Sequence, residues 1–195
     1  MRSALVLTSF LSLATSGFAA LQNTTREFKL VSEVIPGQAA DLARFNGLEV
    51  TGYHSGAGLN DAVLLPSPNG GKAFFNVTNP VVKRPNGEPY YNLIFDLGGD
   101  YPWAPQILDV DFYAEWLPVA INIGNLTSGG AWFAEPEHGG VQFSYGPGQT
   151  GQNEFGGWLV CDWFRGVPQL FTKLSYYNST NPSSCASVYL RRHFL

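Results

Sequence analysis

Charged residues are scarce in this sequence of 195 residues. Lys, Arg, Asp and Glu make up 13% of it, and 15 acidic against 11 basic side chains leave a net charge of −4. Proteins that bind nucleic acid carry basic stripes that neutralise phosphates, and this sequence has none. The low charge does not indicate disorder, because 45% of the residues are hydrophobic and 14% are aromatic. We therefore expect a packed domain that does not bind nucleic acid.

Cysteine is almost absent, with Cys161 and Cys185 as the two examples. Neither belongs to a C-x-x-C motif or has an activating neighbour, so the sequence does not predict a redox-active or nucleophilic thiol. In an oxidising compartment two cysteines pair, and by loop-closure entropy this bond would stabilise the fold by about 3 kcal/mol. We predict a structural disulfide that joins the last segment of the chain to an interior strand.

Histidine is also rare, and its spacing does not predict a metal site. His54, His138 and His193 show neither the H-x-H nor the H-E-x-x-H spacing that places two imidazoles together. His138 follows Glu135 and Glu137 in AEPEHGG, a stretch more typical of a solvated acidic loop than of a metal site. We expect neither a metal ion nor a cofactor.

The chain lacks the motif of an α/β-hydrolase, although a histidine, a serine and an aspartate occur close together in one stretch. The stretch GYHSGAGLNDAVLL, residues 52–65, brings His54, Ser55 and Asp61 close together in sequence. The nucleophile of an α/β-hydrolase lies in G-x-S-x-G between a strand and a helix, and this motif does not occur in the chain. The glycines separate two apolar segments instead. We interpret the stretch as strand, loop and strand.

The sequence does contain the pattern of a secretory signal peptide. Arg2 precedes an uncharged apolar stretch, and small residues lead up to a cleavage point after Ala19. The stretch is shorter than the roughly 20 apolar residues of a membrane span, and polar residues follow at once. An uncleaved anchor is the alternative. We predict a signal peptide over residues 1–19 and one secreted, extracellular domain over residues 20–195, with no membrane association after cleavage.

Four acceptor sequons for N-glycosylation support export. They begin at Asn23, Asn76, Asn125 and Asn178. A single N-x-[ST] match arises often by chance, but four in a chain with a signal peptide predict that at least one is modified. A modified asparagine has to lie on the surface, so each sequon also constrains the fold.

Apolar and polar residues alternate along most of the chain. EFKLVSEV, DVDFYAEW and EPYYNLIFDL show the period of two that is typical of half-buried antiparallel strands. Clusters of Gly, Pro and Asn separate such segments, and the one helical candidate is a short segment over residues 38–45. The pattern predicts an all-β fold, an antiparallel jelly-roll-like β-sandwich with at most one or two short helices. A closed β-barrel is the alternative.

Acidic residues on one predicted strand suggest an enzyme. Asp109 and Asp111 share a strand face, and Glu135 or Glu137 could oppose them from a neighbouring segment. Retaining glycoside hydrolases hold two carboxylates about 5 Å apart across a cleft. The alternation of this strand also predicts a simpler arrangement, in which its acidic residues form the solvated face. We favour the solvated face and assign no catalytic residue.

Aromatic residues offer a binding surface. The sequence contains five tryptophans: Trp103, Trp116, Trp132, Trp158 and Trp163. We expect most of them in the core, because the interior of an all-β domain needs large rings. Trp103 lies with Tyr101 in the proline-flanked loop GGDYPWAP, where it is either tucked under the loop or exposed. These two residues are the candidate ligand contacts.

Two stretches, RFNGLEVTGYHSGAGLNDAVLL and GGWLVCDWFRGVPQLF, resemble a family of small secreted fungal proteins. That family is defined by a domain of unknown function. The resemblance covers most of the chain after the predicted signal peptide. It implies export by a fungus and one compact domain. It implies no catalytic or binding residue.

These observations favour a non-catalytic binding or interaction module of the extracellular space or cell surface. A carbohydrate or a host or cell-wall component is the candidate partner. The alternatives are a small carbohydrate-active hydrolase that uses paired carboxylates and a structural wall-associated protein. A hydrolase predicts a cleft with two carboxylates, whereas a binding module predicts exposed aromatic side chains on a shallow face.

Overall fold

The computed structural model describes residues 25–76, 91–99, 101–108, 114–124, 132–134, 142–144 and 155–195. The strands of the first half are β1 (Phe28–Val34), β2 (Leu48–Gly56), β3 (Leu59–Pro66), β4 (Lys72–Asn76), β5 (Asn92–Asp96) and β6 (Trp103–Ile107). Those of the second half are β7 (Trp116–Ile123), β8 (Trp132–Ala134), β9 (Gln142–Ser144), β10 (Phe155–Cys161), β11 (Gln169–Leu174) and β12 (Cys185–Phe194). One short 3-10 helix, η1 (Ala40–Phe45), completes the described elements.

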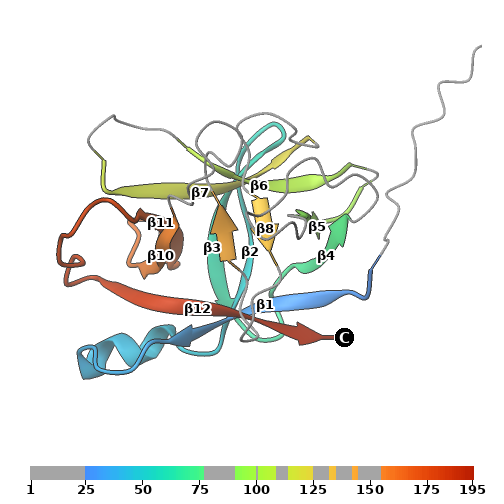
Figure 1. Cartoon of the computed structure of the whole chain (residues 1–195). Helices are drawn as coiled ribbons and strands as arrows, with labels where there is room; N and C mark the ends of the chain where they lie inside the picture. Colours follow the sequence, from blue (N-terminus) through green and yellow to red (C-terminus); the bar gives the residue numbers. More distant parts are fainter. Residues whose placement is uncertain are drawn as a thin grey trace, which may run out of the picture.

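The strands form a closed antiparallel β-barrel rather than the sandwich that we favoured from the sequence. Ten of them make one sheet in the order β10-β12-β1-β2-β3-β11-β7-β6-β5-β4. Additional pairings of β10 with β11, β1 with β4 and β3 with β7 close this sheet on itself. The hairpin of β2 and β3 crosses the molecule from the level of β1 and β12 to that of β6 and β7 (Figure 1). The all-β prediction is confirmed, and the barrel was its alternative form.

Alternating side chains explain why these segments are strands. In β1, Phe28 and Leu30 point into the core, and β12 pairs with β1 along all seven residues from Phe28 to Val34. The same alternation occurs in a sandwich and in a barrel, because both bury one face of each strand. The pairings that close the barrel, such as Phe28 with Ala73, join residues that lie far apart in sequence.

The interior of the barrel is filled by side chains. Its largest fully buried residues include Phe28, Phe45 and Phe95. A void of about 10 Å³ remains in the core, lined by apolar residues from several strands. Ligand pockets measure roughly 300 to 1,000 Å³, so this void is too small for an organic ligand. This void in the core is therefore not a candidate binding site.

The short helical prediction over residues 38–45 corresponds to η1. Leu42 and Phe45 of this helix are buried against the barrel. Gly47, which follows the helix, donates its backbone N–H to the carbonyl oxygen of Ser32 at 2.8 Å. The helix therefore packs against β1 and β12.

A partly buried ion pair holds the loop between β3 and β4. Lys29 Nζ donates to Glu49 Oε2 at 2.8 Å and to the carbonyl oxygen of Pro68 at 2.7 Å. The backbone N–H of Gly70 donates to Glu49 Oε2, also at 2.8 Å. A Cβ at Gly70 would lie 2.2 Å from the Cβ of Glu49, so no larger residue fits without a shift of the backbone.

This environment lowers the pKa of Glu49. Burial of the carboxyl raises its pKa, but hydrogen bonds from Lys29, the Gly70 amide and Ser67, together with the charge of Lys29, outweigh that effect. The net pKa is below the ordinary value of 4.5. Glu49 is therefore a structural carboxylate that is ionised in the fold.

The predicted disulfide is confirmed. Cys161 of β10 and Cys185 of β12 are paired residues of neighbouring strands, and their Cα atoms lie 4.0 Å apart. Both side chains are buried with Leu159. The bond therefore fastens the last strand to β10 immediately before the chain enters the loop from β10 to β11.

Candidate functional site

Several residues singled out in the sequence lie outside the described residues. These are Asn23, Asp109, Asp111, Asn125, Glu135, Glu137 and His138. The hypothesis of paired carboxylates therefore remains a sequence-based expectation. Elsewhere in the described ranges, no three His, Cys, Asp or Glu side chains are grouped to hold a metal ion. In the same ranges, no helix has the length and hydropathy to cross a membrane.

The stretch over residues 52–65 is a β-hairpin, as interpreted from its glycines. β2 pairs with β3, with Tyr53 opposite Asp61 and His54 opposite Asn60. Because side chains alternate along a strand and paired residues share a face, His54 and Asp61 point to opposite faces of the hairpin. The hairpin therefore does not assemble a His–Asp dyad.

Trp103 and Tyr101 differ in how they are held. Trp103 opens β6, packs against the main core and donates its indole N–H to the carbonyl oxygen of Gly98 at 3.1 Å. Its ring is thus tied to its own loop. Tyr101 is 50% exposed, and Ile123, which pairs with Trp103 across β6 and β7, is also exposed. Contact of Tyr101 and Trp103 with a ligand stays a prediction from the sequence.

A more pronounced surface feature lies in the loop between β10 and β11. The backbone N–H of Gly166 donates to the carbonyl oxygen of Trp163 at 3.0 Å, which closes a β-turn over residues 163–166. Phe164 and Arg165 occupy the two central positions of this turn and project from the barrel. Gly166 has a φ of +79°, a left-handed conformation that favours glycine. The sequence WFRG therefore specifies the turn locally.

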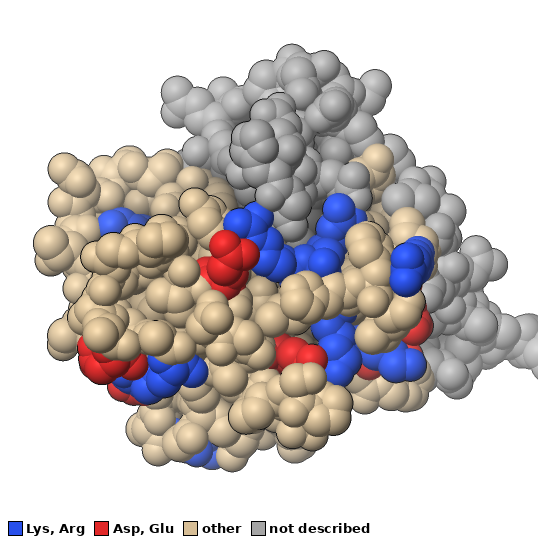
Figure 2. Space-filling model, turned by 90° about the horizontal axis from the view of Figure 1, so that it is seen from below, with Lys and Arg blue, Asp and Glu red and all other residues tan. Residues whose placement is uncertain are grey.

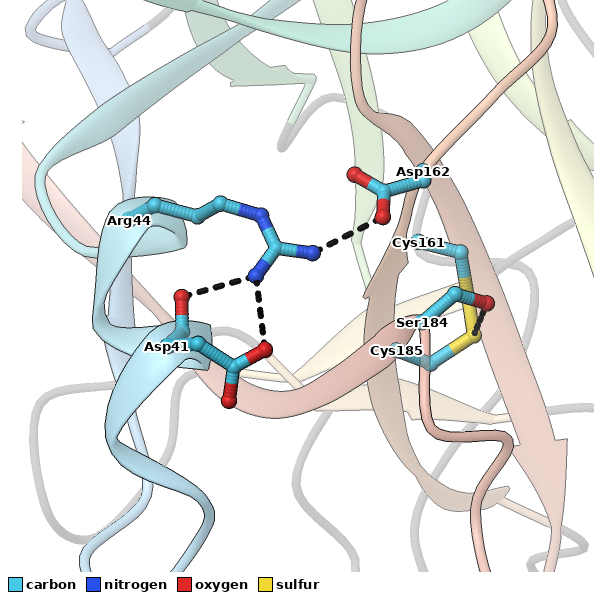
Figure 3. A network of polar contacts seen from close by, with 6 residues as sticks. All are labelled: Asp41, Arg44, Cys161, Asp162, Ser184 and Cys185. Atoms are coloured by element: carbon cyan, nitrogen blue, oxygen red, sulfur yellow. Dashed lines mark hydrogen bonds and ion pairs between the residues drawn. A yellow bond between two sulfur atoms is a disulfide. The ribbon is translucent and has the colours of Figure 1, made fainter.

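Both ends of this loop are anchored to the barrel. On the β10 side, Arg44 of η1 donates to the carboxylate of Asp162 at 2.8 Å while it also binds Asp41 (Figure 3). The disulfide of Cys161 lies one residue earlier in the chain. On the β11 side, the carbonyl oxygen of Pro168 accepts the backbone N–H of Leu64 at 2.9 Å. The turn is thus presented on a constrained base.

Four side chains form a cluster at this turn, which we call the aromatic–arginine cluster: Tyr53, Trp163, Phe164 and Arg165. The rings of Tyr53 and Trp163 meet edge to face with centroids 5.5 Å apart, and those of Trp163 and Phe164 do so at 5.2 Å. The Arg165 guanidinium carbon lies 5.7 Å, 5.6 Å and 5.2 Å from the centroids of Tyr53, Trp163 and Phe164. At such distances the electron-rich faces of aromatic rings attract the positive charge of a guanidinium.

Phe164 is the most exposed large apolar side chain of the described residues, with 84% of its surface open to solvent. Arg165 forms no ion pair with any described residue, whereas Arg44 and Arg191 each bind a carboxylate. The nearest acid in sequence, Asp162, is engaged by Arg44. The cluster therefore combines an exposed aromatic ring with a positive charge that no described acid neutralises.

Charge elsewhere on the surface is mixed. Figure 2 shows the face of β1 and β12, where basic and acidic side chains lie next to one another rather than in a broad field of one sign. Two of these contacts are the pairs of Arg191 with Glu33 and of Lys72 with Glu27, at 2.7 Å and 3.7 Å. Arg191 and Lys72 of this face therefore have acidic partners, whereas Arg165 has none among the described residues.

Comparison with known protein families finds one match, over residues 25–194, to a domain of unknown function, DUF7907. The chain belongs to the DUF7907 family. The match spans every described strand from β1 to β12. No curated protein and no solved structure shows a significant similarity to the chain. The resemblance to a family of unknown function is thereby confirmed, and it carries no assigned activity.

Sequence reasoning did not single out the cluster of this DUF7907 domain. The sequence GWLVCDWF is mostly apolar and has the composition of a buried strand, but β10 ends at Cys161 and Trp163 stands in the loop, partly exposed. Trp158, in contrast, is buried as expected. The one available signal was the glycine after FR, because it allows a turn that places Phe164 and Arg165 at the tip.

Proposed function

We propose that this DUF7907 protein is an exported, non-catalytic binding module that holds its partner with the aromatic–arginine cluster. The observation that carries the proposal is the 84% exposure of Phe164 at the tip of an anchored turn. A partner that covered this ring would gain roughly 1.5 to 3 kcal/mol from burial of the side chain. Exposed aromatic and arginine side chains are the residue types that dominate binding energy at protein interfaces.

The anchoring of the loop strengthens this proposal. A flexible loop loses conformational entropy when it binds, whereas a loop that is already held loses less. Here Arg44, the neighbouring disulfide and the backbone bond from Leu64 restrict the loop before any partner arrives. The arrangement favours recognition of a partner by a surface of fixed shape.

Export remains part of the proposal. It is supported by the apolar stretch before Ala19, by the sequons and by a disulfide, which is compatible with an oxidising compartment. Asn178 is exposed in the loop between β11 and β12, whereas Asn76 ends β4 and is half-buried. We propose cleavage after Ala19, a single domain over residues 20–195, a fungal source and glycosylation of Asn178.

Expression of the full chain through a eukaryotic secretory pathway tests export and glycosylation. We expect secreted protein that begins at Ala20 and loses mass on treatment with an N-glycanase. Asn178→Gln should remove a glycan, and Asn76→Gln is the matched control that should not. Retention in the cell, or an unchanged mass after deglycosylation of each form, would contradict this part of the proposal.

Binding is tested with purified secreted protein against three kinds of immobilised probe: short peptides, a glycan array and phospholipid vesicles. We expect saturable binding in one arm that Phe164→Ser weakens by about tenfold or more, a loss of about 1.4 kcal/mol. The matched control is Tyr176→Ser, which removes an exposed aromatic side chain from a different loop. Binding that neither variant changes, or no binding in any arm, overturns the proposal.

A second pair of variants, Tyr101→Ser and Trp103→Ala, tests in the same assay the two ligand contacts that the sequence predicted. Trp103 packs against the core, so its variant also needs a thermal unfolding curve to show that it is folded. If these variants lower binding and Phe164→Ser does not, the partner site lies at the start of β6 instead.

A further inference from the structure

We infer that the partner of the aromatic–arginine cluster is an acidic protein segment that presents an apolar side chain beside a carboxylate. This inference rests on the proposed binding function and specifies the partner. Its starting point is charge complementarity, because Arg165 places a positive charge at the exposed tip of the turn, while the chain as a whole has a net charge of −4. A positive charge at the tip attracts the carboxylate of an anionic partner to that place on the surface.

The environment of Arg165 supports a carboxylate as its missing partner. In the described part of the chain, Arg44 is bound to Asp41 and Asp162, and Arg191 is bound to Glu33. Arg165 instead contacts three rings and no described acid. Rings attract a guanidinium but accept few of its five N–H donors, which leaves donors for a carboxylate in a paired, two-bond geometry.

The position of Phe164 supports an apolar side chain next to that carboxylate. Phe164 and Arg165 are consecutive residues at the tip of one turn, so a single short segment can reach both. The ring of Trp163 lies behind Phe164 at 5.2 Å between centroids and supports it from one side. The outer side of the Phe164 ring is then available to a partner's apolar group.

Other classes of partner fit this geometry less well. A membrane surface is held by several apolar groups or by an apolar group with a basic patch, and the described tip offers one phenylalanine and one arginine. The acidic chain would also be repelled by anionic lipid. A sugar platform needs a broad exposed ring face, whereas Trp163 is partly covered by the edge contacts of Tyr53 and Phe164. An acidic peptide segment satisfies both features of the tip.

The test measures binding of the secreted protein to three sets of peptides that share a central Leu, Phe or Trp. Asp and Glu flank this residue in the first set, Ser in the second and Lys in the third. We expect the acidic set to bind about tenfold more tightly than the neutral set, and the basic set to bind most weakly. Raised salt should weaken the acidic set more than the neutral set.

A charge reversal at position 165 shows whether Arg165 binds the acidic side chains of the peptide. Arg165→Glu should reverse the order, so that the basic peptides bind more tightly than the acidic ones. Lys72→Glu changes the net charge equally on another surface, because Lys72 lies in β4 near Glu27. This control should keep the wild-type order. Thermal unfolding of both variants establishes that they are folded.

Each outcome has a defined meaning. Peptide binding that Phe164→Ser weakens by about tenfold or more, together with reversal in Arg165→Glu, supports the inference. Equal binding of the three peptide sets, or an unchanged order in Arg165→Glu, overturns it, while a loss in Phe164→Ser would still support the proposed binding function. Binding to anionic vesicles or glycans without peptide binding likewise overturns the inference alone. No saturable binding in any arm up to about 1 mM overturns both.

Discussion

Two loops of this barrel treat charge and apolar surface in opposite ways. The loop between β3 and β4 covers the carboxylate of Glu49, which accepts hydrogen bonds from the Gly70 amide of this loop and from Lys29 of β1. The loop between β10 and β11 holds an aromatic ring, Phe164, out in solvent, next to an arginine without an acidic partner among the described residues. The first loop provides hydrogen bonds for the carboxylate that it buries. The second loop leaves its phenylalanine ring in solvent and its arginine without a described acidic partner. A loop that serves only to connect strands has no need of the second arrangement.

The loops also differ in how they are anchored. Glu49 anchors the first loop from beneath through an ion pair and a backbone hydrogen bond. The second loop is anchored at its base, by the disulfide of Cys161 and by Arg44, while its tip stays free. These anchors can be removed one at a time, and the amides of Gly70 and Gly166 report on the two loops separately.

The largest effect is expected from removal of the disulfide. Cys161 and Cys185 are separated by 24 residues, and replacement of both by Ser should lower the free energy of unfolding by about 3 kcal/mol. Denaturant unfolding measures this loss. Hydrogen exchange should accelerate at the Gly166 amide and stay slow at the Gly70 amide. Equal acceleration at both amides would mean that the bond stabilises the whole barrel without holding the turn.

Removal of the buried carboxylate is expected to have the next largest effect. Glu49→Gln keeps the shape of the side chain but leaves Lys29 without its counter-charge, which should cost about 1 to 3 kcal/mol of stability. Exchange should now accelerate at the Gly70 amide and not at the Gly166 amide. Glu33→Gln removes the exposed pair with Arg191 and is the matched control, for which we expect little change. A similar loss in the two variants would show that the burial of Glu49 has no special role.

The sequence predicted much of this framework. Alternation in EFKLVSEV predicted β1, the cysteines predicted the disulfide, and the glycines of residues 52–65 predicted the hairpin of β2 and β3. Closure of the barrel was not predictable in the same way. Pairings such as Asp61 with Ala120 join distant residues, and the alternation of each strand is the same whether the sheet edges meet or not.

The candidate site was harder to predict for a physical reason. Apolar residues continue from β10 into the loop with only Asp162 between them, so Phe164 has the sequence pattern of a core residue. Only the three-dimensional arrangement shows that the strand stops at Cys161 and that the next rings turn outward. Glu49, in turn, looks like a solvated strand residue, and its burial depends on a loop that returns over it.

The pH dependence of stability should reveal the contribution of Glu49, the carboxylate that the loop between β3 and β4 covers. The folded pKa of Glu49 lies below the ordinary value of 4.5, so its contribution to stability is complete above that value and is lost as pH falls through the folded pKa. Arg191 lowers the pKa of the exposed Glu33 in the same direction. In denaturant titrations between neutral and acidic pH, Glu49→Gln should lose less stability than the wild type. An identical decline in both proteins would contradict the assignment of a lowered pKa to Glu49.

The smallest effect on stability is expected from a substitution in the loop between β10 and β11. Its size distinguishes a binding role of Phe164 from a structural role. Phe164 is 84% exposed, so Phe164→Ser should change the free energy of unfolding by less than about 0.5 kcal/mol. Exchange at the Gly166 amide should stay slow, because the base of the loop is unchanged. An unchanged stability would agree with the proposed role of Phe164 in contact with a partner. If Phe164→Ser instead destabilises the barrel as strongly as Glu49→Gln, the ring has a packing role and the contrast between the two loops disappears.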